Sequence, residues 1–186
     1  VLILRIRRKM DSAQEAKHIY DELGIDLNDL GCIMAEMTAP EIDLPDEWLY
    51  YANDKTRLWI DGVVSQSHVT LKYGLLPGVT RKHVDRVLEG WQLTDIQAKD
   101  IMVFNSPYED ERYKCIVLAV ESDGLVDANR RLSMLPNVST FKEYRAHLAV
   151  AYVREDKATE AVDMIRNQIH GYHPEFTEIS YGDQIV

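Results

Sequence analysis

The chain has little cysteine and no long apolar run. Its two cysteines, Cys32 and Cys115, stand far apart, and neither belongs to a CxxC pair or a Cys/His cluster. We therefore expect two free thiols in a reducing cytosol and no metal site. No apolar run approaches the ~20 residues that a membrane span needs, and the opening VLILRIRR is too short for the core of a signal peptide. These absences predict a cytoplasmic protein with no membrane partner.

Basic residues are also scarce. Lys and Arg number 21 against 31 Asp and Glu, the net charge is −10, and the sequence pI is about 5.0. Long nucleic acids are bound by basic surfaces, so this balance disfavours them, although a small nucleotide needs only a few local donors. Neither GxGxxG nor GxxxxGK[ST] occurs, so a phosphate-binding glycine loop is not expected.

Short apolar runs alternate irregularly with helical patterns along the 186 residues. Apolar periodicity and the positions of Gly and Pro predict strands at 32–37, 69–73, 113–121, 148–153 and 176–181, and one strand or a bent pair of strands at 95–104. They predict helices at 11–23, 81–89, 125–135 and 158–169. We read 44–59, which is rich in Tyr, Trp and Asp, as a short helix and an irregular loop. This order favours an α+β fold with antiparallel sheets over a doubly wound parallel one.

The sequence contains one predicted strand pattern twice. SHVTLKYG contains His68 and AHLAVAYV contains His147, 79 residues later, and a tyrosine follows each histidine by five residues. Because alternate side chains of a strand share a face, His68 and Thr70 are expected on one face, as are His147 and Ala149. A helix is predicted after each strand. The repeat therefore indicates two related lobes that face each other rather than a solenoid.

If the two strands meet, two imidazoles and a hydroxyl converge on one small volume. Imidazoles titrate near neutral pH, so one can take a proton while the other gives one, and the hydroxyl of Thr70 can hold a phosphate oxygen without adding charge. This set suits phosphodiester chemistry that uses neither metal nor cofactor. The alternative for either His68 or His147 is a structural histidine with satisfied hydrogen bonds.

These residues resemble a known family. HVTL and HLAV resemble the paired His-x-Thr/Ser-x motifs of the 2H phosphoesterase superfamily, the 2′-5′ RNA ligase-like proteins. The stretch VESDGLVDANRRLSMLPNVSTFKEYRAHLAVAYV is similar to the helix, loop and strand that lead into the second motif, especially in bacteriophage-encoded members. The resemblance implies a domain at 31–186, after an N-terminal arm and helix at 1–30. Its fold would be bilobal α+β, with pseudo-twofold symmetry, two mostly antiparallel sheets flanked by helices, and a central cleft.

The resemblance also implies an activity. Family members act without a metal on cyclic-phosphate or 2′-5′/3′-5′ phosphodiester bonds of nucleotides, so the partner would be a small nucleotide or short oligonucleotide. Some phage members degrade the cyclic nucleotides that bacteria make as an antiphage alarm, an anti-CBASS role in the host cytoplasm. His68, Thr70 and His147 match the motifs, whereas Ala149 stands where Thr or Ser is expected. The missing hydrogen bond is worth roughly 1.5–3 kcal/mol, or about one to two decades of rate.

Four further residues are candidates for binding substrate. Tyr144 and Arg145 stand at the entrance to the second motif strand, where the planar fork of Arg145 would clamp a phosphate or lie on the surface. Tyr51 and Trp59 would stack a base or pack under a long loop. The tyrosines five residues after the histidines should point away from them unless the strands bulge.

Two other functions stay open. A degenerate member could sequester a nucleotide without cleaving it, with Ala149 as the sign of lost catalysis. The start at Val1 and the helix predicted at 11–23 would also fit a structural domain attached to a virion or another assembly.

Overall fold

The structure, a computed structural model, describes residues 24, 26, 29–54, 58–106, 111–138 and 143–186, with only the backbone of 53, 54, 58 and 59. The helix predicted at 11–23 lies outside these residues. The described elements are β1 (Gly31–Met37), η2 (Asp46–Trp48), β2 (Tyr51–Asp54), β3 (Leu58–Asp61), β4 (Ser67–Leu75), α2 (Arg81–Val87), β5 (Gln97–Asn105), β6 (Tyr113–Glu121), α3 (Asp123–Leu132), β7 (His147–Arg154), η3 (Glu155–Lys157), α4 (Ala158–Gln168) and β8 (Phe176–Tyr181).

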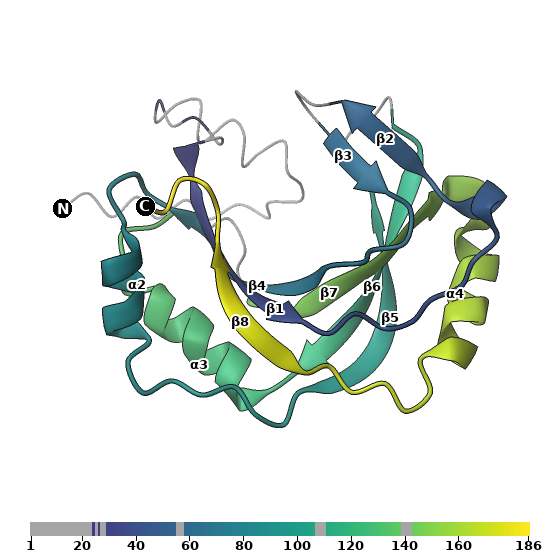
Figure 1. Cartoon of the computed structure of the whole chain (residues 1–186). Coiled ribbons are helices and arrows are strands. Elements are labelled where there is room, and N and C mark those ends of the chain that lie inside the picture. Colours follow the sequence, from purple (N-terminus) through teal and green to yellow (C-terminus); the bar gives the residue numbers. More distant parts are fainter. Residues whose placement is uncertain (1–23, 25, 27–28, 55–57, 107–110, 139–142) are drawn as a thin grey trace.

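The predicted strands and helices within the described residues are confirmed, with one exception. The segment 44–59 was expected to be a short helix and a loop, but only the 3₁₀ turn η2 is helical, and β2 and β3 form an antiparallel hairpin. These strands have four residues each, too few to show a period of two against their polar neighbours. The hairpin stands at the end of β7, where Leu49 and Val63 bridge to Val153 and Ala151 (Figure 1).

The main sheet has six strands in the order β5-β6-β7-β4-β1-β8, and each described pair is antiparallel. The α+β class is thus confirmed. The two sheets expected from the sequence are continuous halves of this one sheet. β4, β1 and β8 form the first half, and β7, β6 and β5 form the second. The halves join where Val69 of β4 pairs with Leu148 of β7.

One face of the sheet carries the hydrophobic core. Both residues of the joining pair, Val69 and Leu148, are fully buried in the same cluster as Leu132 of α3 and Ile165 of α4. In Figure 1, α2 and α3 lie beside the first half and α4 lies beside the second. The helices pack on this face. On the opposite face, the motif histidine His68 is exposed and His147 is partly buried.

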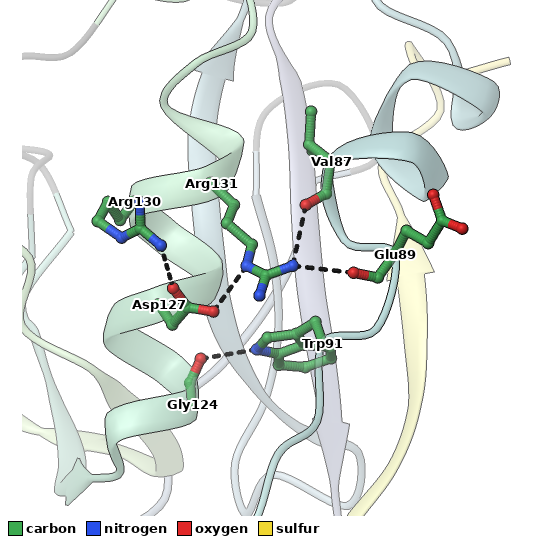
Figure 2. A network of polar contacts seen from close by, with 7 residues as sticks. All are labelled: Val87, Glu89, Trp91, Gly124, Asp127, Arg130 and Arg131. Atoms are coloured by element: carbon green, nitrogen blue, oxygen red, sulfur yellow. Dashed lines mark hydrogen bonds and ion pairs between the residues drawn. The ribbon is translucent and has the colours of Figure 1, made fainter.

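An arginine of α3 holds the end of α2 in place (Figure 2). The Arg131 guanidinium donates to the backbone oxygens of Glu89, at 3.0 Å, and Val87, at 3.5 Å, and its Nε donates to Asp127 at 2.7 Å. The last carbonyls of a helix have no hydrogen-bond donor within the helix, so a cationic side chain that donates to carbonyls there stabilises the helix end. Arg130 also pairs with Asp127. Its hydrogen bond is the main cause that holds the pKa of the Asp127 carboxyl below its ordinary value, and Arg131 acts in the same direction.

A β-bulge interrupts the first motif strand three residues after its histidine. Ile33 pairs with Lys72 and Met34 pairs with Thr70, so Leu71 is an extra residue in β4. A bulge reverses the alternation of side chains beyond it. As a result Lys72 turns toward the helices, where it is 6% exposed and donates to the Ser133 hydroxyl at 3.0 Å.

The second motif strand has a bulge at the same place. Ile116 pairs with Ala151 and Val117 with Ala149, so Val150 is the extra residue in β7, again three after the histidine. Beyond the bulges, Tyr73 pairs with Cys32 and Tyr152 pairs with Cys115. Partners that lie directly opposite share a face, so both tyrosines lie on the face of the histidines. For strands without bulges we expected both tyrosines to point away from the histidines, and the two bulges are the reason that they do not.

Candidate active site

His68 and His147 lie on neighbouring strands and on the same face of the sheet, opposite the helices. The antiparallel register around the Val69–Leu148 pair sets His68 beside Ala149 and Thr70 beside His147. The two imidazoles are close enough that the charge of His147 disfavours the protonated form of His68. Side chains that lie 79 residues apart in the sequence thus meet across one strand boundary.

The ring of His147 is fixed from two sides. Its Nδ1 lies 2.8 Å from the backbone oxygen of Arg145, and because a carbonyl can only accept, Nδ1–H is the donor. Nε2 is then the nitrogen left for chemistry. The Phe104 ring meets the imidazole edge to face, with the centroids 5.0 Å apart and the planes at 81°. This contact orients the imidazole further.

Phe104 was not among the residues singled out from the sequence. It lies on the outer strand β5, pairs with Cys115 of β6, and is 39% exposed on the face of the histidines. Its strand was predicted, but nothing in the sequence indicated which strand β5 would join. The only signal in the sequence that could have found it is a phenylalanine within the strand predicted at 95–104.

His68 has a charged neighbour that His147 lacks. Glu36 of β1 lies directly opposite His68 in the register, and its carboxylate accepts a hydrogen bond from the Ser180 hydroxyl of β8. Burial lowers the pKa of the His68 imidazole, His147 acts in the same direction, and Glu36 opposes both. The sequence analysis missed Glu36 because its importance follows only from strand pairing.

The two motif positions after the histidines differ in chemistry. Thr70 brings a hydroxyl to the histidine face, where it lies next to the Cys32 thiol. Ala149 brings only a methyl group, although its backbone oxygen accepts from the Ser67 hydroxyl at 3.2 Å. Only one of the two motifs therefore supplies a hydroxyl that could hold a phosphate oxygen.

Tyr144 and Arg145 lie just before β7, and each makes a hydrogen bond that supports the motif strands. The Tyr144 hydroxyl donates to the Thr70 backbone oxygen at 3.0 Å, and burial raises the pKa of this phenol. The Arg145 side chain is 76% exposed and pairs with Glu143 at 3.2 Å, while its carbonyl orients His147. Both residues thus support the motif strands, and the clamp role expected for the Arg145 side chain stays a prediction.

Tyr51 and Trp59 lie on the small hairpin. The Tyr51 hydroxyl donates to Asp46 at 2.8 Å, and this bond, with the nearby carboxylates, raises the pKa of the phenol. Trp59 pairs with Asn53 across the hairpin, and its side chain lies outside the described residues. No described contact brings Tyr51 to either histidine, so stacking by these two residues also stays a prediction.

The two cysteines are free, and burial raises the pKa of each thiol to about 11. Within the described ranges, no group of three or more His, Cys, Asp or Glu side chains could hold a metal ion. No helix of the described chain is both long and apolar enough to cross a bilayer.

A shallow depression of about 560 Å³ lies away from the histidines, between the end of α2 and β8. It is lined by Asp85, Leu88, Trp91, Gln92, Leu93, Thr94, Phe176 and Ile179. Trp91 closes one side, with its ring edge-on to Phe176 and its Nε1–H donating to the Gly124 oxygen at 2.8 Å (Figure 2). The depression contains no residue of the two motifs.

The similarities of this chain to known proteins are confined to solved structures of low sequence identity. No protein-family profile and no curated protein matches the chain. Among solved structures it is similar to Usb1 of Kluyveromyces marxianus, at 8% identity over 83% of this chain and 94% of that chain, with a TM-score of 0.44. The same protein with uridine monophosphate gives 7% identity, 84% and 95% coverage, and a TM-score of 0.45. Likeness at this level carries no argument about function.

Proposed function

We propose that this chain is a metal-independent nucleotide phosphodiesterase of the 2H type. The observation that carries the proposal is the meeting of His68 and His147 on neighbouring strands, on one face of the sheet, with Thr70 beside them. Two imidazoles that interact electrostatically can exist in opposite protonation states near neutral pH. That is the requirement for a reaction in which one group takes a proton and another gives one.

The proposed reaction balances without a further reactant. One neutral imidazole takes the proton of the attacking hydroxyl or water as its oxygen bonds to phosphorus. The bond from phosphorus to the leaving oxygen breaks, and the other imidazolium gives that oxygen its proton. The Thr70 hydroxyl donates to a non-bridging phosphate oxygen, whose charge grows in the transition state. His147 would act through Nε2, because Nδ1 is bound to the Arg145 oxygen.

The proposed substrate is a small nucleotide or a short oligonucleotide with a cyclic or a 2′-5′/3′-5′ linkage. The net charge of −10 argues against long nucleic acids. Phe104 and Tyr73 are 39% and 40% exposed and lie on the histidine face, so both offer a ring on which a base could stack. The motif resemblance favours a phage enzyme that degrades a host defence nucleotide in the host cytoplasm, which is the finest form of the proposal.

The test is a panel of 2′,3′-cyclic nucleotides, cyclic dinucleotides and trinucleotides, and 2′-5′ oligoadenylates, incubated with EDTA and read by mass. We expect turnover of at least one of these nucleotides, and a loss of about 10²-fold or more in His68→Ala and in His147→Ala. His170→Ala is the matched control, since His170 is exposed and far in sequence from both motifs. Full turnover in either motif variant, with circular dichroism unchanged, contradicts the proposal.

Binding without cleavage is the second candidate, and Ala149 is the observation that favours it. With a methyl group in place of a hydroxyl, one hydrogen bond to the phosphate is lost, while the surface that would hold a nucleotide remains. Calorimetry that shows binding, together with unchanged ligand after long incubation, would favour this function over the first.

A further inference from the structure

The two halves of the sheet carry equivalent positions around their histidines. β1 flanks the first motif strand as β6 flanks the second, and the partner of His68 is Glu36, whereas the partner of His147 is Ala119. Both pairs precede the bulges, so both lie on the histidine face. One histidine therefore has a carboxylate directly opposite it, and the other has a methyl group.

The carboxylate of Glu36 is held in place. Ser180 of β8 donates its hydroxyl hydrogen to Glu36, and the Thr177 hydroxyl donates to the Glu36 backbone oxygen at 3.2 Å. Directly opposed residues of an antiparallel pair have Cβ atoms roughly 4.5–5.5 Å apart, which brings a glutamate within reach of an imidazole. The Glu36 side chain is only partly buried.

We propose that Glu36 is a positioning residue for His68, whose carboxylate, oriented by Ser180, stabilises the protonated imidazole. The catalytic role of Glu36 rests on the proposed function, whereas its effect on the protonation of His68 can be tested without a substrate. Titratable groups on the elements that pack around His68 are Glu36 and Cys32 from β1, His147 from β7, and Tyr73 on β4 itself. Of these, Glu36 is the one that favours the imidazolium, against burial and His147.

The consequence is a division of labour between like residues. A carboxylate beside an imidazole stabilises the charge that develops when the ring takes a proton, and it fixes the ring's orientation. His147 obtains its orientation from a neutral carbonyl and from Phe104 instead. The protonation of His68 should thus depend on Glu36, and that of His147 should not.

The test is an NMR titration of the histidine rings in the full chain, which needs no substrate. His68→Gln and His147→Gln assign the two signals by their loss. We expect Glu36→Gln to lower the pKa of His68 and to leave His147 unmoved, because a neutral amide stabilises the imidazolium less than a carboxylate does. Glu41→Gln, at an exposed glutamate outside the sheet, is the charge-matched control. A His68 pKa unchanged in Glu36→Gln, or an equal shift in every histidine, overturns the inference.

A swap variant sharpens the result. Glu36→Gln combined with Ala119→Glu moves the carboxylate to the other half, and the pKa of His147 should then rise as that of His68 falls. If nucleotide turnover is found, Glu36→Gln should lower kcat/KM on the order of tenfold and move one limb of its pH profile to lower pH. A loss of rate with both limbs unmoved would mean a structural role and overturns the inference. If no nucleotide is turned over, the proposed function fails while the titration still decides this point.

Discussion

The two halves of the sheet share a backbone plan but differ in chemistry. In each half the motif strand has its bulge three residues after the histidine and its tyrosine two residues after the bulge, opposite a cysteine. The strands that flank them also follow one order, with β1 and β8 on one side and β6 and β5 on the other. A symmetric scaffold is thus present on the face that holds the histidines.

The side chains on that scaffold are not symmetric. The first half carries Glu36 and Thr70, whereas Ala119 and Ala149 occupy the equivalent places in the second. At the outer strands, Gly182 lies beside Cys32, bonded to its oxygen at 2.9 Å, whereas Phe104 lies opposite Cys115. At these positions the first half is therefore more polar than the second.

The largest effect is expected when either of the two histidines is removed. Each single alanine variant should lose about 10²- to 10⁴-fold in turnover, because each removes one proton transfer. Since both act in the same step, the double variant should be scarcely slower than either single one. Single-turnover rates of the three variants measure this. Losses that multiply would mean that the two histidines act independently.

Making the halves alike at the second motif position should raise activity. Ala149→Thr adds the hydroxyl that the first half has, and we expect an increase of about 10- to 100-fold in kcat if the new hydrogen bond forms in the transition state. Thr70→Ala is the matched opposite and should lose a similar factor. A rise in affinity for the product with unchanged kcat would show that the hydroxyl acts in the ground state instead.

Removing the ring that only the second half has should weaken binding. Base stacking on an aromatic side chain is worth roughly 1–3 kcal/mol, so Phe104→Ala should raise the Kd of a bound nucleotide by about five- to 100-fold. Phe104→Leu keeps the apolar bulk and separates stacking from burial. Isothermal titration measures the Kd of a nucleoside monophosphate and of inorganic phosphate. Only the Kd of the nucleoside monophosphate should rise in Phe104→Ala, because inorganic phosphate has no base to stack.

The smallest difference between the halves is expected at their cysteines. Burial raises the pKa of both Cys32 and Cys115 to about 11 from 9.0. Because only the thiolate reacts, alkylation at pH 8 should be about 100-fold slower than for an ordinary thiol, and equally slow at both sites. The same chain in urea should react at the ordinary rate. Fast modification of one cysteine alone would show that the two thiols are not equally protected in the two halves.

The raised thiol pKa values also set the sign of a pH effect on stability. Between about pH 9 and pH 11 the folded chain retains thiol protons that the unfolded chain releases. The free energy of unfolding should therefore be unaffected by these groups below pH 9 and fall as the pH rises from there to 11. Urea midpoints across that range, compared with those of Cys32→Ser, measure the contribution.

Much of this fold was accessible from the sequence because its signals are local. The strands at 113–121 and 176–181 were both predicted with the bounds that are observed. The first of them is an apolar, β-branched run that ends at a polar residue. The small hairpin was missed because its strands have only four residues each, too few to show a period of two. Within the site, His68, Thr70 and His147 could be singled out because a repeated pattern is visible without any knowledge of contacts.

Glu36, Phe104 and the orientation of the two tyrosines could not be predicted in the same way. Each depends on which strands become neighbours and in what register, and a shift of one residue turns every later side chain to the other face. Leu71 and Val150 look like ordinary strand residues, yet as bulges they bring Tyr73 and Tyr152 to the face of the sheet that carries the histidines.

The amino-acid sequence by itself determined the elements, the duplication and the pair of imidazoles, because propensity, period and repetition act over a few residues. Only the tertiary structure decided that one imidazole would have a carboxylate opposite it and the other an aromatic ring. Those neighbours come from strands far apart in the chain, and their placement follows from the free energy of packing the whole sheet.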